Sequence, residues 1–134
     1  MPSAAEPQPL DVILDVVFER GLLFLVLENT GDLPAHGVRV KFGERFTGID
    51  GAKRIDRLAL FRRLEYLAPR KAIEVFLDRS ASYFARDQPT TLTASVSWRT
   101  SEGERRRATI VHDLEIYRDL GYIEREVPPS GRPA

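Results

Sequence analysis

Apolar and polar side chains alternate along much of this sequence. The segments 38–42 and 91–99 carry an apolar residue at every second position, with charged or hydroxyl side chains between them. Successive side chains of a strand point to opposite faces of its sheet, so this period of two predicts half-buried antiparallel strands. The inward-facing set of the second segment ends at Trp98, which we predict to be a core anchor rather than a ligand platform.

The same pattern, less regular, extends to other parts of the chain. Residues 12–19 alternate, although Ile13 and Val17 intrude on the polar face. Leu22 to Leu27 is apolar at both parities, which is typical of a central strand covered on both sides. Two further strands are expected over 73–77 and 108–116.

Turn-forming residues separate these segments about every ten positions. They lie at Arg20-Gly21, 29–34, 68–70 and 101–104. Glycine and asparagine tolerate the backbone angles of tight turns, and proline interrupts a strand. Short strands at this spacing predict an all-β fold, an immunoglobulin-like antiparallel β-sandwich of about seven strands.

The segment 43–63 departs from the alternation. Its apolar residues recur at spacings of three, as in a short helix, at Ile55, Leu58, Phe61 and Leu64. We predict an irregular crossover with at most one helical turn, followed by a strand over about 63–67. Residues 79–87 are predicted to form a loop.

Proline marks both ends of the chain. Residues 2–9 contain three of the nine prolines, and residues 127–133 contain three more. Such segments bury too little apolar surface to offset the entropy of ordering them. We therefore expect disordered tails at 1–9 and 124–134 around one sandwich domain at 10–123, which suits a chain of 134 residues.

Composition excludes several kinds of function. Twenty basic and twenty acidic residues cancel, so no global field attracts nucleic acid or an anionic membrane. The absence of cysteine excludes disulfides, thiolate metal sites and cysteine nucleophiles. We expect no cofactor, no nucleic-acid partner and no membrane insertion.

The N-terminal residues give an expectation about location. They carry neither the basic nor the apolar region of a secretory signal, and the apolar stretch 22–27 is far shorter than a membrane span. We expect a cytoplasmic protein, or alternatively a fragment of a longer exported one.

Two stretches carry a family resemblance. The first runs from Leu25 through Asn29-Thr30-Gly31 to Val40, and the second is Leu64-x-x-Leu67-Ala68-Pro69-x-Lys71 followed by 73–75. Over about residues 22–99 the chain resembles the bacterial and archaeal immunoglobulin-like domains related to the cell-adhesion-related (CARDB-type) modules. The resemblance implies a seven-strand sandwich with a binding or spacer role and no catalytic residues. Arg70 stands where those modules usually have a turn glycine.

No catalytic set is evident. His36 is expected in a solvated loop and His112 as a half-buried, hydrogen-bonded side chain, because a metal site would need further ligands such as Asp32 or Asp113. Most carboxylates lie on the polar parity of strands, where they keep the sheet surface hydrated and oppose aggregation. We therefore predict a protein that is not an enzyme.

Candidate binding residues are basic or aromatic. Basic residues cluster at 53–63 and 105–107, and loop aromatics lie nearby, either tucked under the loops or exposed as a contact patch. The residues selected as binding candidates are Phe46, Phe61, Arg62, Arg63, Tyr83, Phe84, Arg105, Arg106 and Tyr122.

These features together favour a non-catalytic protein-interaction or scaffolding module. Contacts are expected from 43–67, 79–87 and 114–123, the last of which either wraps over a sheet edge or pairs with another chain. The partner is expected to be another protein or a second copy of this one. The alternative is weak binding of an anionic ligand, or binding of a carbohydrate, through the arginine clusters and loop aromatics.

Overall fold

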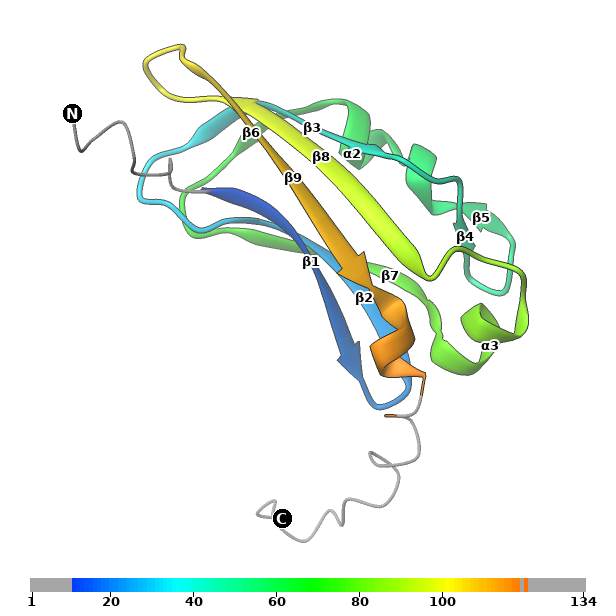
Figure 1. The fold of residues 1–134 in the computed structure, drawn as a ribbon. Coiled ribbons are helices and arrows are strands. Elements are labelled where there is room, and N and C mark those ends of the chain that lie inside the picture. Colours follow the sequence, from blue (N-terminus) through cyan, green and yellow to red (C-terminus); the bar gives the residue numbers. More distant parts are fainter. Residues whose placement is uncertain (1–10, 119, 121–134) are drawn as a thin grey trace, which may run out of the picture.

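Two antiparallel sheets packed face to face form the body of the protein (Figure 1). The structure is a computed structural model that describes residues 11–118 and residue 120. One sheet has the order β1-β2-β7 and the other β6-β3-β8-β9. Their strands are β1 (Val12–Glu19), β2 (Leu22–Asn29), β3 (Ala35–Phe42), β6 (Leu64–Leu67), β7 (Ala72–Arg79), β8 (Thr91–Arg99) and β9 (Arg105–Asp113).

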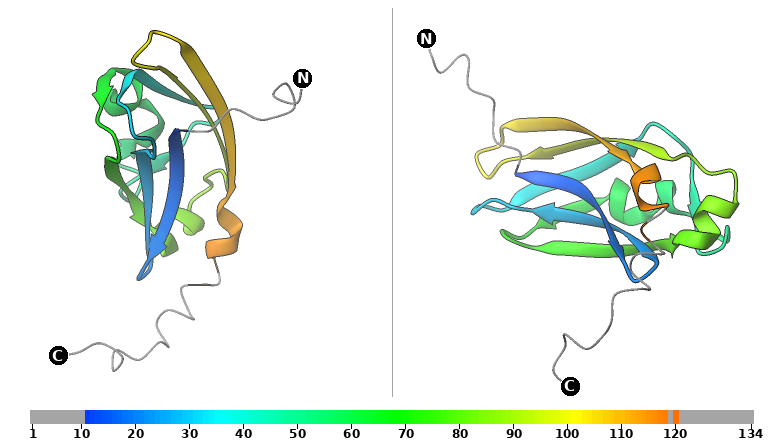
Figure 2. Two further views of the ribbon diagram at one scale, coloured as in Figure 1. Left: turned by 90° about the vertical axis from the view of Figure 1, so that its left-hand side faces the viewer. Right: turned by 60° about the horizontal axis from the view of Figure 1, so that its bottom comes forward.

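This strand order confirms the predicted sandwich. Strands β1, β2 and β7 take the places of A, B and E of an immunoglobulin domain, and β3, β8 and β9 those of C, F and G. The fourth main strand, β6, pairs with β3 in the second sheet. Figure 2 shows the two layers from the side, with the connections between them at the ends of the sandwich.

The core lies between the inner faces of the sheets. Every second residue of β8 is buried, ending at Trp98, which is 2% exposed. From the opposite sheet, Leu23, Leu25 and Leu27 of β2 are fully buried. The alternation in the sequence therefore identified the inward-facing side chains, including the indole that was expected to anchor the core.

The outer face of β2 differs from expectation. Leu22 to Leu27 was predicted to be covered on both sides, yet Phe24 is only half-buried and its cross-strand neighbour Phe76 is 37% exposed. Among the described residues, the short helices pack at the ends of the sandwich or against the second sheet. The outer face of the first sheet is thus only partly open, because Val26 on the same face is buried.

The crossover between β3 and β6 is irregular, as predicted. It contains β4 (Thr47–Gly48), β5 (Lys53–Arg54), the 3₁₀ turn η1 (Ile55–Arg57) and the helical turn α2 (Ala59–Arg62). The limit of one helical turn was wrong, because Ile55 and Phe61 each need a turn of chain to reach the core. Both side chains are at most 1% exposed, so the crossover closes one end of the sandwich.

Two other segments contain helices where none was predicted. The expected loop at 79–87 contains α3 (Ser80–Ala85), which turns Tyr83 into the core, where its hydroxyl donates to the carbonyl of Pro89 at 2.6 Å. The last strand ends at Asp113, three residues earlier than expected. The carboxylate of Asp113 accepts from the Glu115 N–H and caps the 3₁₀ turn η2 (Leu114–Tyr117).

Residues 114–117, the described start of the predicted contact segment 114–123, pack back against the sandwich. Leu114 is fully buried, and the Tyr117 ring stacks on Phe18 of β1 at 5.6 Å. Tyr122 and the predicted tails at 1–9 and 124–134 lie outside the described residues. Within the described part of the chain, no helix is long and apolar enough to cross a membrane.

Arg70 occupies the turn position where the resembled modules have glycine. Its φ is +59°, a conformation that glycine adopts more readily than arginine. Its guanidinium pairs with the carboxylate of Asp32 at 2.7 Å, on the neighbouring loop. The turn therefore keeps the backbone shape expected of glycine while using arginine.

Gly48 tests how tightly the crossover packs on the first sheet. A Cβ at this position would overlap the carbonyl oxygen of Leu77, which also accepts from the Ile49 N–H. We predict that Gly48→Ala lowers the free energy of unfolding by about 3 kcal/mol, because backbone must shift to admit the methyl group. Urea denaturation measures this change.

The matched control is Gly43→Ala. A Cβ there would make ordinary contact with the Thr93 Cβ at 3.5 Å, and its φ is not in the left-handed region. We expect a change within about 0.5 kcal/mol. Equal losses in the two variants would contradict close packing of β4 on β7.

Candidate functional site

Basic side chains gather on the outer face of the second sheet. The register aligns Arg39 of β3 with Ser97 of β8 and Arg107 of β9. The adjacent row is Lys41, Ser95 and Thr109. Because the residues between them along each strand are buried, these side chains point to solvent. We call this the basic face.

A β-bulge adds a third row. Between His36 and Arg39 the pairing with β8 shifts, and Gly37 adopts φ +56°. The bulge aligns His36 with Arg99 and Arg99 with Arg105. A Cβ on Gly37 would lie 3.2 Å from the Arg99 guanidinium, so glycine lets this side chain lie close over the backbone.

The basic face contains a shallow groove of about 450 Å³. Its floor is formed along β8 by small residues, Ser95 and Ser97. Arg39 and Lys41 form one wall, and Arg107 with Thr109 forms the other. The walls are two strand spacings apart, about 10 Å between backbones. Such a groove presents cations on both sides of a hydroxyl-lined floor.

The cations of the basic face are not neutralised by neighbouring carboxylates. In the described part of the chain, none of these five forms an ion pair: Arg39, Lys41, Arg99, Arg105 and Arg107. Their three rows contain no acidic residue. Since an exposed guanidinium keeps its charge at any physiological pH, the face is a permanent positive patch.

Several carboxylates elsewhere are paired with arginine. Hydrogen bonds from the Arg54 guanidinium lower the pKa of Asp56, and those from Arg79 lower the pKa of Asp50. A general acid would instead need a raised carboxyl pKa. Burial raises the pKa of the Tyr83 hydroxyl, which keeps it protonated as the donor to Pro89. These shifts fit structural roles.

Three aromatics predicted as binding residues are buried and are not exposed as a contact patch. Phe46, Phe61 and Tyr83 are each at most 1% exposed. Phe42 packs edge-on against the first two, with ring centroids 5.0 and 5.1 Å apart. They were selected as loop aromatics, but their loops fold over an open end of the sandwich and fill it. The tucked-under alternative is the one observed.

The structure describes only one of the two remaining aromatics that were predicted to bind. Phe84 is half-buried beside Tyr83, and the Arg118 guanidinium lies 4.6 Å from its ring centroid. It therefore sits at the α3 end and not on the basic face. Tyr122 lies outside the described residues, so its role as a binding residue stays a prediction.

The four predicted arginines lie at different places relative to the basic face. Arg105 lies on the basic face, whereas Arg106 has the opposite parity, aligns with Trp98 and pairs with Glu104 at 3.1 Å. Arg62 and Arg63 are exposed beside the face. The Arg39 guanidinium donates to the Arg62 carbonyl at 2.6 Å, which brings the crossover cluster next to the strand arginines.

Four residues of the basic face were absent from the candidate set: Arg39, Lys41, Arg99 and Arg107. Arg39, Lys41 and Arg99 occupy the polar parity of predicted strands, so the alternation did place them on an outer surface, whereas Arg107 directly precedes the strand predicted over 108–116. Two further pieces of information were needed: which strands are neighbours, and in which register. Neither follows from the spacing of residues within one strand.

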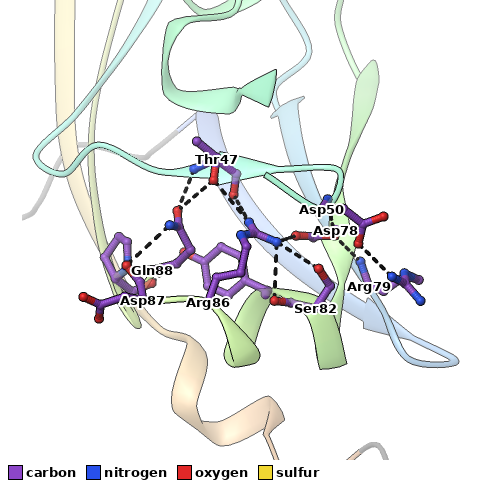
Figure 3. Close-up of polar contacts among 10 residues, drawn as sticks. Thr47, Asp50, Asp78, Arg79, Ser82, Arg86, Asp87 and Gln88 are labelled. Atoms are coloured by element: carbon purple, nitrogen blue, oxygen red, sulfur yellow. Dashed lines mark hydrogen bonds and ion pairs between the residues drawn. The ribbon is translucent and has the colours of Figure 1, made fainter. Parts of the chain in front are cut away.

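A polar network joins the crossover to α3 (Figure 3). The buried Asp78 carboxylate, 1% exposed, pairs with Arg86 at 2.6 Å and accepts from the backbone N–H of Asp50. Arg86 also donates to the Thr47 carbonyl and to the Ser82 hydroxyl. The Ser82 hydroxyl also hydrogen-bonds to the Asp50 carboxylate, which is itself paired with Arg79, so the network fastens the crossover to α3.

Both histidines make packing contacts. The Nε2 atom of His112 lies 2.7 Å from the Leu14 carbonyl oxygen and links β9 to β1, as expected of a half-buried, hydrogen-bonded side chain. His36 was expected in a loop, but it lies on β3 with its ring against Tyr66 at 5.6 Å. The described residues contain no group of three side chains suited to hold a metal ion.

A second hollow, of about 340 Å³, lies at the end of the sandwich near Trp98. Its charged lining mixes signs, since Arg106 is surrounded by Asp11, Glu102 and Glu104. The Nε of Arg106 is buried without a hydrogen-bond partner. The hollow lacks the single sign of charge that distinguishes the basic face.

One family model matches this chain, and its description names no activity. The family model described as Domain of unknown function (DUF8453) matches residues 3–118. Neither the curated proteins nor the solved structures contain a match to this chain.

The polar network allows a stability test. We predict that Arg86→Met lowers the free energy of unfolding by about 3 kcal/mol or more, because it leaves the Asp78 carboxylate buried and unpaired. Arg70→Met removes the exposed pair with Asp32 and should cost less than about 1 kcal/mol. Urea unfolding of both variants measures the contrast. Similar small losses would mean that the network does not fasten the crossover.

Proposed function

We propose that this chain, which belongs to the DUF8453 family, is a non-catalytic protein-interaction module that binds an acidic, extended segment of a partner protein on its basic face. The observation that carries the proposal is the set of five cations on this face without an ion-pair partner among the described residues, three of which, Arg39, Lys41 and Arg107, line the hydroxyl-floored groove. A chain of zero net charge has no general excess of cations, so their collection on one face is a specific feature.

The spacing of the cations suits an extended chain. Arg39 and Lys41 are two residues apart on β3, as are Arg105 and Arg107 on β9, so each pair is separated by about 7 Å along its strand. Alternate side chains of an extended peptide repeat at the same distance. A segment lying along β8 with carboxylates at every second position would therefore meet Arg39 and Arg107 in the central row, Lys41 in the row on one side, and Arg105 in the row on the other.

The hydroxyl groups of the floor add directional contacts. Ser95, Ser97 and Thr109 can each donate to a carboxylate or carbonyl oxygen. Arginine at the walls can grip a carboxylate with two parallel hydrogen bonds. The groove offers a donor on every polar lining side chain and no carboxylate among its described lining residues, which favours an anionic partner over a neutral one.

The proposal of a non-catalytic role rests on the residues of the basic face. The basic face presents no nucleophile paired with a base, and its cations keep one charge state near neutral pH. The CARDB-type resemblance, with its implied binding or spacer role, agrees with this proposal and stays a prediction. The cytoplasmic location likewise stays a prediction.

The second candidate is a small anionic ligand, including an acidic or sulfated carbohydrate. The groove volume of about 450 Å³ favours it, since ligand sites commonly span about 300 to 1,000 Å³. The groove is shallow, however, and its described lining has no aromatic ring on which a sugar could stack. We therefore rank it below the extended acidic segment.

The proposal is tested by titration with two peptides of equal composition. One alternates glutamate and serine, and the other places the glutamates in one block. We predict tighter binding of the alternating peptide, with Arg39→Ala and Arg107→Ala each weakening it about fivefold. Isothermal titration calorimetry at low and high salt measures the affinity.

Lys53→Ala is the matched control, because Lys53 is exposed on β5, away from the basic face, and belongs to the cluster picked out by sequence alone. Its binding should equal that of the unmodified protein. Equal loss in all three variants, or preference for a single-stranded oligonucleotide or a sulfated oligosaccharide over both peptides, would overturn the proposal.

A further inference from the structure

The outer face of the first sheet has the opposite charge. The register aligns Asp15 of β1 with Val26 and Glu74 on β2 and β7, and the next row contains Glu28. Asp15 and Glu74 are exposed, and Glu28 is half-buried. In the described part of the chain, none of these three carboxylates forms an ion pair. We call this the acidic face.

An apolar row crosses the centre of the acidic face. Val17, Phe24 and Phe76 align across the three strands, and the Phe24 and Phe76 rings meet edge to face at 5.7 Å. Outward-facing positions of a two-layer sandwich are normally polar. Exposed aromatic rings bordered by carboxylates are typical of a surface that contacts another molecule.

The complement of this surface is present on the same protein. We propose that the basic face of one copy docks on the acidic face of a second copy. Arg39, Arg99 and Arg107 are the groups suited to the contact, because guanidinium stacks on aromatic rings and also pairs with carboxylates. The neutral net charge means that two copies do not repel each other as wholes, while the two faces attract.

The interface is heterologous, because it joins two different faces. Each copy in a pair leaves one face free, so association continues into stacks instead of closing as a dimer. A face of three eight-residue strands measures about 26 by 14 Å, or about 370 Å². A stable interface buries about 800 Å² on each partner, so stacking is expected to be weak, concentration-dependent and sensitive to salt.

This inference goes beyond the proposed function, since it assigns a role to the acidic face and gives the basic face a second occupant. An acidic partner segment and a second copy would compete for the same cations. Binding of the partner would then disassemble stacks. The two proposals fail separately, because the acidic face takes no part in peptide binding.

Sedimentation velocity of the full chain tests the stacking. We expect the weight-average sedimentation coefficient to rise with concentration at about 10 mM ionic strength and to stay at the monomer value at about 1 M, where charges are screened beyond about 3 Å. Glu74→Lys and Arg107→Glu should each abolish the rise. Lys53→Ala should leave it unchanged.

Mixing the two charge-reversal variants identifies the interface. The Glu74→Lys copy retains its basic face and the Arg107→Glu copy retains its acidic face, so the mixture should associate although each variant alone stays monomeric. The unmodified affinity of Glu74→Lys for the alternating peptide, and urea midpoints within the range of the parent, exclude unfolding. A monomer at all concentrations in low salt, or stacks that survive Glu74→Lys, would overturn the inference.

Discussion

The register of antiparallel pairing among β3, β8 and β9 is the constraint on which both the core and the basic face depend. Pairing Arg39 with Ser97 and Ser97 with Arg107 sends these side chains to one side and their neighbours Val40 and Trp98 to the other. A slip of one residue would exchange the two sets. Burial of Trp98 therefore fixes the position of cations on the opposite face, and the bulge at Gly37 extends the alignment to Arg99.

The strands could be predicted because burial of one face along the whole segment determines their structure. The helical turns could not be predicted because each depends on a single side-chain contact. The segment 91–99 alternates because one face is covered along its whole length. At Asp113 the sequence continues to alternate, yet a side-chain hydrogen bond to the Glu115 N–H turns the chain into η2. Likewise α3 forms because burial of Tyr83 outweighs the turn-like composition around it, a tertiary effect invisible to local patterns.

The sequence indicated that basic residues form the candidate site, but it identified only part of the set. The predicted clusters contain cations that are adjacent along the chain, such as Arg105 and Arg106. In a strand, adjacent side chains point to opposite faces. Cations that meet in space come from residues 39, 41, 99, 105 and 107, on three strands whose pairing is a long-range property. The burial of Phe46 and Phe61 was missed for a related reason, since both lie in the crossover outside the alternating segments, yet they close the core in space.

Zero net charge excludes a long-range field from the whole molecule but not from its faces. The two sheets pack about 10 Å apart, and outward side chains add several ångströms on each side, so opposite charges on the outer surfaces lie about 20 Å from one another. The screening length at physiological salt is about 8 Å. A partner approaching either surface therefore responds to the charges of that surface alone. The balanced composition, which argued against polyanion attraction when averaged over the chain, is for this reason compatible with two oppositely charged binding faces on one small sandwich.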